Sequence, residues 1–217
     1  RDRGPVRFRH NHAMDPGFLT LHPGATAILV LTLAFSVVGL LWLPGLIERC
    51  VLRPYWLVRR GQWHTLVSSG LVHADFGHLL LNMLTFWFFA FQLERAIGTA
   101  RFVALYLLAL VASDLGTYFK HRHQPEYGSL GASGAIAAVL FASIVYYPDQ
   151  SLFIIPIPVP IPAPLFAIGY VAYSWYSARH ARGRINHDAH LGGAVFGLLF
   201  VALTDPAAFR GLARMLG

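Results

Sequence analysis

A serine and a histidine, each followed by small residues, are the side chains of this sequence best suited to covalent chemistry. Ser133 stands in Gly131-Ala132-Ser133-Gly134. The glycines there permit tight turns, and the unpaired amides of a helix start can face an oxyanion. A serine hydroxyl becomes a good nucleophile when a neighbouring base accepts its proton, and His190 is the best-placed candidate. This pair predicts acyl transfer, in which Ser133 attacks a carbonyl, His190 takes and returns the proton, and water resolves the ester.

Two other polar side chains could stabilise the charge that such an attack creates. His78 and Asn82 are four residues apart and therefore lie one above the other on a helix. A neutral imidazole and a carboxamide can both donate to an oxyanion, and loss of one such donor typically costs about 10²-fold in rate. Each residue alone also has a structural explanation, as a helix-opening serine or an interfacial hydrogen-bonding group. The chemical interpretation therefore depends on their joint placement.

The composition indicates that membrane-spanning helices hold these residues. The chain of 217 residues is 56% hydrophobic and 12% charged, whereas a soluble domain has roughly 25% charged residues. The net charge of +7 is distributed between the apolar stretches. This favours anchoring at a lipid bilayer over nucleic-acid binding, which would need the charge on one face. The single cysteine, Cys50, excludes an internal disulfide and is given no role.

Six apolar stretches predict an all-α membrane protein with six transmembrane helices. They run from about Ala25 to Leu43, Phe76 to Ile97, Phe102 to Phe119, Ser133 to Pro148-Asp149, Ala163 to Ala178 and Asp188 to Thr204. The first is interpreted as a retained helix because it is longer than the apolar core of a signal peptide. Residues 1–24 are expected to form a polar arm, residues 25–205 the six-helix domain, and residues 206–217 a short tail.

The connections carry their own signals. Residues 48–72 combine arginines with Trp56 and Trp63, which favour the headgroup zone, so this first loop is expected to lie on the membrane. Residues 154–164 contain repeated prolines and are expected to form an extended connector rather than a helix. Residues 179–184 form a basic loop between the fifth and sixth helices.

Helix count predicts where the polar residues meet. In an up-and-down arrangement, the second, fourth and sixth helices begin on the same side of the membrane. His78 and Asn82 open the second, Ser133 opens the fourth and His190 opens the sixth. Small residues follow Ser133 and His190 on their helices, and small faces let membrane helices approach closely. The three helix starts are therefore expected to form one site.

This set of residues resembles the rhomboid proteases. The resemblance covers roughly the second to the sixth helix. It rests on His73-x4-His78-x3-Asn82, Glu94-Arg95-x2-Gly98, Gly131-Ala132-Ser133-Gly134 and Ala189-His190-x2-Gly193-x3-Gly197. It implies a six-helix rhomboid bundle, a serine-histidine dyad without an acid, and an oxyanion site made by His78, Asn82 and the amide of Ser133. It implies no cofactor and no metal.

The resemblance also implies a substrate class and a location. The expected substrates are transmembrane segments of membrane proteins, cut near small residues by a monomer that suffices for catalysis. The fifth helix is expected to border the route by which substrate enters. The compact plan resembles bacterial members, which implies the bacterial inner membrane with a cytoplasmic N-terminus. Charge does not decide the orientation, because eight Lys and Arg residues fall on one side and nine on the other.

Three departures from the family pattern stand out. Some members carry an aromatic residue one turn after the serine, packed on the histidine ring, whereas this chain has Ala137, so another group must orient His190. The usual tryptophan-arginine pair of the first loop is Trp63-His64 here. Glu94 and Arg95 are adjacent rather than separated by one residue. None of these changes removes a reacting group.

Three acidic residues are assigned structural roles. Asp188 lies two residues before His190, on the wrong side for a helical contact, and is expected to cap the sixth helix rather than complete a triad. Asp75 is placed in the same way before the second helix. Asp114, inside the third helix, is expected to face protein or a wet cavity because a lipid-facing carboxylate is costly.

Alternative functions stay open. One is a metalloprotein using His73, His78, His187 and His190, although the sequence has no His-Glu-x-x-His helix and no carboxylate clearly aimed at the same point. Another is a non-catalytic rhomboid relative that binds membrane helices, which the retention of both Ser133 and His190 argues against. A transporter has less support than either.

Overall fold

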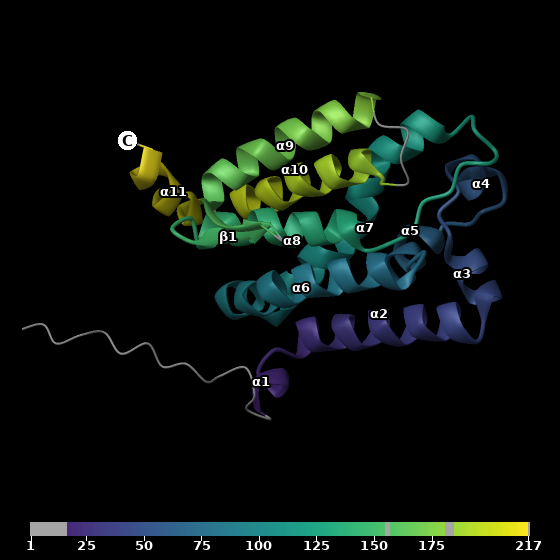
Figure 1. The fold of residues 1–217 in the computed structure, drawn as a ribbon, viewed down its shortest axis with the longest axis horizontal. Helices are drawn as coiled ribbons and strands as arrows, with labels where there is room; N and C mark the ends of the chain where they lie inside the picture. Colours follow the sequence, from purple (N-terminus) through teal and green to yellow (C-terminus); the bar gives the residue numbers. More distant parts are fainter. Residues whose placement is uncertain (1–16, 155–156, 181–184, 217) are drawn as a thin grey trace, which may run out of the picture.

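Long antiparallel helices make up most of the chain in this computed structural model, which describes residues 17–154, 157–180 and 185–216 (Figure 1). They are α2 (Pro23–Leu41), α6 (Phe76–Ile97), α7 (Thr99–His121), α8 (Ser133–Tyr146), α9 (Ala163–His180) and α10 (His187–Thr204). Within the described ranges, α2, α6, α7 and α10 are long and apolar enough to cross a membrane. With the 14-residue α8 and the 18-residue α9, they correspond to the six predicted helices.

The first loop folds into short helices at one end of the bundle. It contains α3 (Pro44–Cys50), α4 (Pro54–Arg59), α5 (Thr65–Ser68) and the 3-10 helix η1 (Ser69–Leu71). Arg53 pairs with Glu48 at 2.6 Å, and the guanidinium of Arg60 lies 3.7 Å from the ring centroid of Trp56. Figure 1 shows α3, α4 and α5 at the end where α6, α8 and α10 begin. The position of this loop on a membrane surface stays a prediction.

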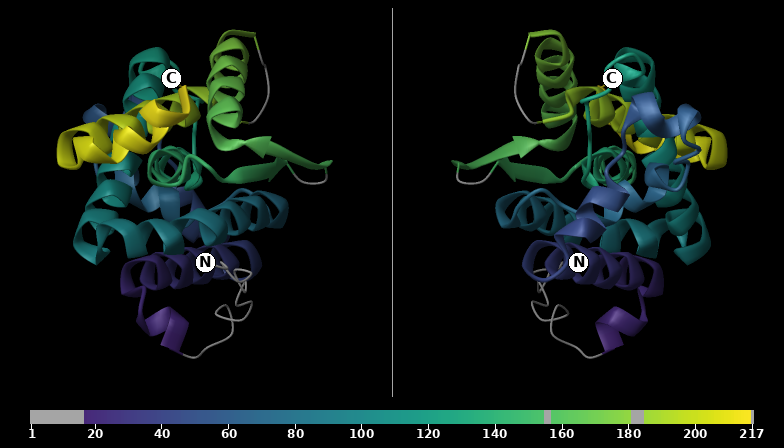
Figure 2. Two further views of the ribbon diagram at one scale, coloured as in Figure 1. Left: turned by 90° about the vertical axis from the view of Figure 1, so that its left-hand side faces the viewer. Right: turned by 90° about the vertical axis from the view of Figure 1, so that its right-hand side faces the viewer.

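The proline-rich connector is extended, as predicted, but it folds back on itself. Strands β1 (Ser151–Ile154) and β2 (Ile157–Pro162) pair antiparallel, with Ser151 opposite Pro162 and Leu152 opposite Ile161. Prolines at alternate positions of β2 leave the amides of the residues between them free to join the ladder. The hairpin extends sideways from the helices (Figure 2). Residues 155 and 156 of the predicted connector lie outside the described residues.

Short helices stand at both ends of the described part of the chain. The short tail expected at residues 206–217 contains the 3-10 helix η2 (Pro206–Ala208) and α11 (Phe209–Leu216). Its sequence, Phe-Arg-Gly-Leu-Ala-Arg-Met-Leu, spaces two arginines four residues apart and so gathers them on one face. The predicted polar arm is described only from Gly17, where α1 (Gly17–Thr20) begins. Residues 181–184 of the basic loop also lie outside the described residues.

Helix α8 forms the centre of the molecule. Every residue from Gly134 to Val145 is buried, so this helix has no solvent-facing or lipid-facing side along that stretch. Figure 2 shows α8 end-on, surrounded by the other helices and the start of the hairpin. A helix that is apolar all round is one enclosed by protein or lipid. Here protein encloses the helix that begins with Ser133.

A buried carboxylate ties α2 to the rest of the bundle. Glu94 is 2% exposed and accepts hydrogen bonds from the amides of Gly24 at 3.0 Å and Ala25 at 2.7 Å, in the first turn of α2. The Thr99 hydroxyl donates to the same carboxylate at 2.7 Å. A negative group at a helix N-terminus satisfies free amides and complements the helix dipole. Glu94 therefore fixes α2 against α6 and the start of α7.

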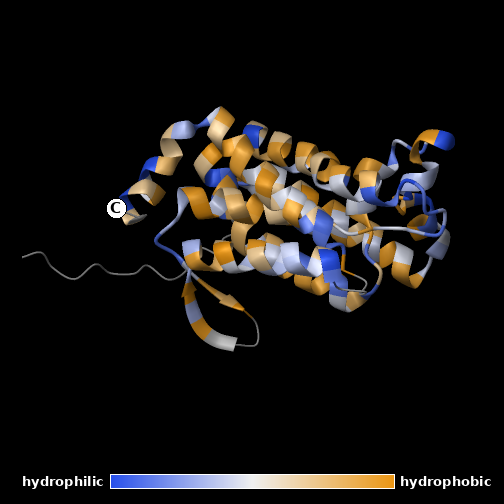
Figure 3. Ribbon diagram, turned by 90° about the horizontal axis from the view of Figure 1, so that it is seen from above, coloured by the Kyte–Doolittle hydropathy of each residue, from blue (hydrophilic) through white to orange (hydrophobic). Residues whose placement is uncertain are grey.

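The outer surface of the helices is apolar. Figure 3 shows hydrophobic residues along the helices and hydrophilic ones concentrated towards the end loops. Large apolar side chains stand exposed on several helices, among them Leu80 of α6, Phe119 of α7, Ile168 of α9 and Leu203 of α10. Exposure of this extent disfavours a water-facing monomer, whereas lipid is a suitable solvent for it. The protein is therefore an integral membrane protein.

Candidate active site

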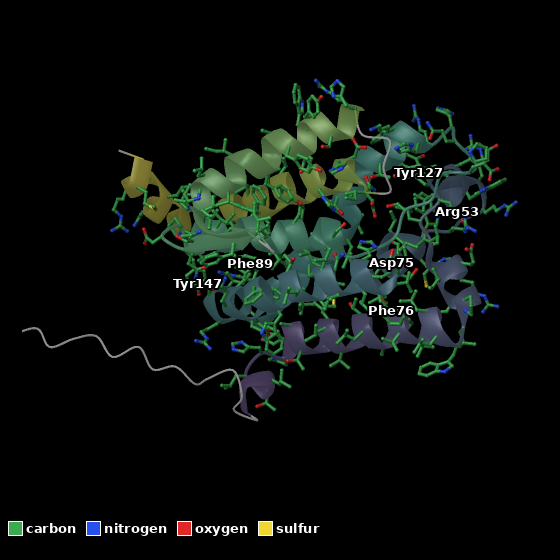
Figure 4. All side chains as sticks on the ribbon, in the orientation of Figure 1. Arg53, Asp75, Phe76, Phe89, Tyr127 and Tyr147 are labelled. Atoms are coloured by element: carbon green, nitrogen blue, oxygen red, sulfur yellow. The ribbon has the colours of Figure 1, made fainter. Side chains whose placement is uncertain are left out.

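The three helix starts that carry the predicted site residues lie at the same end of the bundle (Figure 1). His78 is in the first turn of α6, Ser133 is the first residue of α8, and His190 is in the first turn of α10. In Figure 4, Asp75 and Phe76 mark the start of α6 and lie towards this end, whereas Phe89 and Tyr147 lie further along the bundle. The shared position predicted from helix count is observed.

Helices α8 and α10 touch through their backbones next to Ser133 and His190. A Cβ atom added at Gly193 would collide with the carbonyl oxygen of Gly134, and one added at Gly197 would collide with that of Ala138. Gly134 directly follows Ser133, and Gly193 lies three residues after His190. The close approach predicted from the small residues is therefore present at the turns that carry the nucleophile and base candidates.

Ser133 and His190 keep part of their surfaces accessible. Both are intermediate in burial, between the enclosed core of α8 and the exposed loops. Within the described part of the chain, no hydrogen bond joins the two side chains. Catalytic hydrogen bonds are often long in ligand-free enzymes and shorten when substrate binds. The dyad therefore stays a proposal, with the two helices in contact around it.

His78 lies against the turn that leads to Ser133. Gly131 has φ +111°, and a Cβ there would stand 2.6 Å from Cε1 of His78. The amide of Gly131 donates to the carbonyl of Ser69 at 2.9 Å, which fixes this turn on η1. Asn82, 7% exposed, donates from Nδ2 to the carbonyl of His78 at 2.9 Å. A carboxamide has two N–H donors, so this bond uses one of them.

His73 supports His78 from behind. The ring centroids of the two histidines are 4.9 Å apart in an edge-to-face arrangement. His73 is fully buried, and its Nδ1 lies 2.9 Å from the hydroxyl of Ser36 on α2. Burial lowers the pKa of His73 to about 3; His78 lowers it further and Asp75 opposes the shift. His73 is therefore neutral at pH 7 and positions the ring of His78.

Asn186 connects the start of α10 to the loop before Ser133. It is the N-cap of α10, because its Oδ1 accepts from the amide of Ala189 at 3.1 Å. Its Nδ2 donates to the hydroxyls of Thr117 at 2.9 Å and Ser129 at 3.0 Å. Ser129 exchanges backbone hydrogen bonds with Leu52 of the first loop. One side chain therefore links α7, α10 and the segment that ends at Ser133.

The capping role predicted for Asp188 is wrong. Helix α10 begins one residue before Asp188, at His187, so Asp188 is inside the first turn and Asn186 takes the cap. Asp188 instead pairs with Lys120 of α7 at 2.7 Å. The prediction for Asp75 is confirmed, since its Oδ1 accepts from the amide of His78 at 2.8 Å. Asp114 is buried at 9% exposure, as expected for a protein-facing residue.

Residues 60–206 match the family described as Rhomboid domain. The chain belongs to this family. It is 30% identical over 195 residues to "Rhomboid protein 1, mitochondrial" of Saccharomyces cerevisiae, covering 84% of this chain and 54% of that protein. It is 38% identical over 128 residues to "Putative rhomboid protease YdcA" of Bacillus subtilis, covering 55% and 60%.

A human relative is likewise matched over only part of its length. The chain is 34% identical over 144 residues to "Presenilin-associated rhomboid-like protein, mitochondrial" of Homo sapiens, covering 63% of this chain and 36% of that protein. The rhomboid chain thus spans less than two thirds of each of these relatives. The family match supports a rhomboid-type intramembrane protease or a rhomboid-like function.

One aromatic neighbour of His190 in this rhomboid chain was not predicted from the sequence. The ring of Tyr170 on α9 stacks against His190, with centroids 6.2 Å apart and planes at 25°. Ala137 of α8, where some members carry the aromatic residue, is buried and offers no ring. A signal was present: Tyr170 and Tyr173 have the same three-residue spacing as His187 and His190. Two helices with matching spacings can place both pairs in contact.

The histidines considered for a metal site form two separate ring contacts. His73 contacts His78, and His187 contacts His190 with centroids 5.8 Å apart. Among the residues that the structure describes, no group of three or more His, Cys, Asp or Glu side chains is arranged to hold a metal ion. The metal hypothesis therefore gains no geometric support from this part of the chain.

Proposed function

We propose that this rhomboid-family protein is an intramembrane serine endopeptidase that cleaves transmembrane segments of other membrane proteins. Ser133 is the nucleophile and His190 is the general base. The observation that carries the proposal is the backbone contact between α8 and α10, at Gly134 and Gly193, beside these two residues. The family match supports the same reaction class.

The reaction follows from the two side chains. His190 accepts the proton of the Ser133 hydroxyl as its oxygen attacks the scissile carbonyl carbon. The tetrahedral intermediate collapses, the C–N bond breaks, and His190 returns the proton to the leaving amine. Water then attacks the Ser133 ester with His190 again acting as base, which releases the acid product and restores the serine.

Three donors are proposed to stabilise the oxyanion: the side chains of His78 and Asn82 and the backbone amide of Ser133. His78 is packed on Gly131, two residues before Ser133. The amide of Ser133 belongs to the first turn of α8, where backbone amides have no partner within the helix. Fixed donors of this kind are worth about 10²-fold each in rate.

An apolar groove beside α9 suits a transmembrane substrate. Its walls come from α8, α9 and α10 and are made by Phe141, Ala167, Ile168, Val171, Ala172, Trp175 and Leu198. The groove offers almost no polar surface, as expected for contact with a lipid-embedded helix. All proposed site residues belong to one chain, so a monomer suffices for catalysis.

The test is cleavage of a reporter transmembrane segment by the purified protein in vesicles of defined lipid. Ser133→Ala and His190→Ala are each expected to reduce cleavage to background. Ser143→Ala is the matched control on the same helix; Ser143 is buried, donates to the carbonyl of Phe89, and should leave cleavage close to that of the unchanged protein. Undiminished cleavage by either site variant would reject the assignment.

Two alternatives are outcomes of the same experiment. A folded protein that binds the reporter without cutting it, and that no serine-reactive phosphonate labels, would be a non-catalytic rhomboid-like binder. Activity that depends on stoichiometric bound zinc or iron would establish the metalloprotein.

The membrane in which the protein resides is proposed separately. We infer the bacterial inner membrane from the compact six-helix plan, and a Bacillus subtilis relative supports it. Other relatives carry mitochondrial names. Fractionation of the source cells tests the proposal, and recovery of the protein in mitochondria would contradict it.

A further inference from the structure

Helix α9 contacts the start of α10 through two ring pairs. Tyr170 stacks on His190, with centroids 6.2 Å apart at 25°, and Tyr173 meets the edge of His187 at 5.4 Å and 84°. His187 and His190 themselves are in edge-to-face contact at 5.8 Å. The four rings form a continuous cluster, which we call the tyrosine–histidine ladder.

The ladder packs against the side of the His190 imidazole, which has no aromatic neighbour on α8 among the described residues. Position 137, one turn after Ser133, is alanine, and in the part of the chain that the structure describes the His190 side chain makes no hydrogen bond. Its described aromatic neighbours are Tyr170 and His187. A ring without a hydrogen-bonding partner is oriented by the groups that pack on its faces and edges.

Tyr170 is itself held on more than one side. Its ring contacts Phe141 of α8 at 5.4 Å and Phe166 of α9 at 5.9 Å. The side chain is partly buried, in contrast to Tyr173, which is 61% exposed. Tyr170 is therefore the better fixed of the two tyrosines and the one that presents a ring face to His190.

The end of α9 next to the ladder is tied to the bundle by Lys120. Its ammonium donates to the carbonyl of Ala178, in the last turn of α9, at 2.7 Å, and to Asp188 of α10 at 2.7 Å. The first half of α9 packs on α8 and α10 through an apolar cluster that includes Ala163, Phe166 and Val171. The ladder and the Lys120 tie are the contacts of α9 with the start of α10.

We propose that Tyr170 is a positioning residue, which holds His190 in line with Ser133 from α9. This inference rests on the proposed function, because it assigns how the general base of that reaction is oriented. It makes alignment of the base depend on α9 being in place. Displacement of α9 would separate the Tyr170 and His190 rings and leave the imidazole without its face contact.

The experiment compares Tyr170→Leu with Tyr170→Phe in the full chain. Phe keeps the ring that stacks on His190 and removes only the hydroxyl, whose polar neighbour is Ser174 on the same helix. Tyr170→Leu is expected to lower kcat roughly tenfold to a hundredfold with little change in KM, the scale typical of a misaligned catalytic group. Tyr170→Phe is expected to stay close to the unchanged protein.

Labelling by a small serine-reactive phosphonate separates positioning from substrate access. Such a probe does not have to displace α9 as a transmembrane helix would, so its reaction rate reports activation of Ser133 by His190. The Leu variant should label slower by about the same factor as its loss in kcat. Tyr176→Leu is the control on the same helix, because Tyr176 is exposed and stacks on His180 away from the site.

The outcomes are distinct. Normal labelling of Tyr170→Leu with a raised KM would overturn the inference and make Tyr170 a residue of substrate access. Equal losses of kcat in the Phe and Leu variants would overturn it as well, because the aromatic ring of Tyr170 would then not be what orients His190. Absence of labelling in the unchanged protein would instead reject the proposed function, and the inference with it. Thermal unfolding in detergent shows that each variant is folded.

Discussion

At the scale of single residues, Gly131 is the position where backbone and site chemistry meet. Replacement by alanine imposes a positive φ on a residue with a Cβ and drives that atom to 2.6 Å from the His78 ring. We expect Gly131→Ala to cost about 1–3 kcal/mol in stability and roughly tenfold or more in cleavage rate, because His78 or the turn before Ser133 must move. Unfolding in detergent and reporter cleavage measure the two effects.

Gly61 offers a matched control for that substitution. It also has a positive φ, +63°, but a Cβ there meets no atom within 4 Å. Gly61→Ala should therefore cost about 1 kcal/mol of stability and leave cleavage unchanged. If both alanine variants cleave equally well, His78 is not held by Gly131.

Replacement of Asn186 should disturb several elements at once, because its side chain bonds to α7, to α10 and to the loop before Ser133. Asn186→Ala removes the cap of α10, worth about 1 kcal/mol. It also leaves the hydroxyls of Thr117 and Ser129 without their amide donor, at a cost of about 1–3 kcal/mol. We expect a lower free energy of unfolding together with slower cleavage, since Ser129 lies in the loop before Ser133.

Asn186→Asp keeps an oxygen that can accept from the amide of Ala189 and removes the donated N–H bonds. Its stability should therefore fall between that of the alanine variant and the unchanged protein. An alanine variant as stable as the unchanged protein would show that the hydrogen bonds of Asn186 contribute nothing to the free energy of unfolding.

Sequence reasoning singled out the candidate reacting residues more readily than their neighbours. Ser133, His190, His78 and Asn82 could be singled out because each has polar chemistry in an apolar setting. The contact of Tyr170 was not predicted, because its three-residue spacing to Tyr173 indicates a possible pairing with His187 and His190 only once α9 and α10 are known to be neighbours. Asp188 was misassigned because the helix start moved by one residue, and N-caps depend on that register.

At the scale of elements, the contact between α8 and α10 is the one most sensitive to side-chain size. Gly193→Ala places a methyl group against the carbonyl of Gly134 and must separate the two helices. We expect a cost of about 1–3 kcal/mol in stability and a loss of cleavage and of phosphonate labelling, because Ser133 and His190 move apart with their helices. Equilibrium unfolding and labelling rates measure these effects.

Gly169→Ala on α9 is the control for the effect of replacing a glycine within a helix where no neighbouring helix is in contact. No atom lies within 4 Å of a Cβ at this position. The change should be neutral or stabilise by up to about 1 kcal/mol, since alanine favours a helix over glycine. A similar loss in both variants would show that helix separation is not the cause.

The long helices were predictable because each is a continuous apolar stretch bounded by glycine, proline or charged residues. The hairpin of β1 and β2 could not be predicted, because repeated prolines exclude a helix but do not indicate whether the extended chain reverses its direction. Two short helices of the first loop were also missed, although Pro44 and Pro54 stand at their first positions, which is a known preference of proline.

At the scale of the whole molecule, stability should fall at mildly acidic pH. His73 is neutral in the folded protein, with a pKa of about 3, whereas an unfolded histidine has a pKa near 6.5. The unfolded state therefore binds an extra proton between these values. The contribution of His73 is complete above pH 6.5 and is lost as the pH falls towards 3, by about 1.4 kcal/mol per pH unit in the middle of this range.

The measurement is the free energy of unfolding of the unchanged protein and of His73→Asn at pH 7, 6 and 5. The variant starts less stable at pH 7, because it loses the contacts to Ser36 and His78. Its free energy of unfolding should then depend less steeply on pH, because unfolding of the variant takes up about one proton fewer. His22, whose pKa burial also lowers, contributes equally to both proteins. Parallel pH dependences would contradict the assignment to His73.

The enclosure of α8 also has a consequence for the choice of host lipid. Its 14 residues span about 21 Å, against a hydrocarbon thickness of about 30 Å. Because protein surrounds it, longer acyl chains can thicken the bilayer around α2 and α7 without extending α8. Ser133 would then lie deeper beneath the headgroups, and a different peptide bond of the same substrate would reach it. Acyl chain length should therefore select the cleavage position.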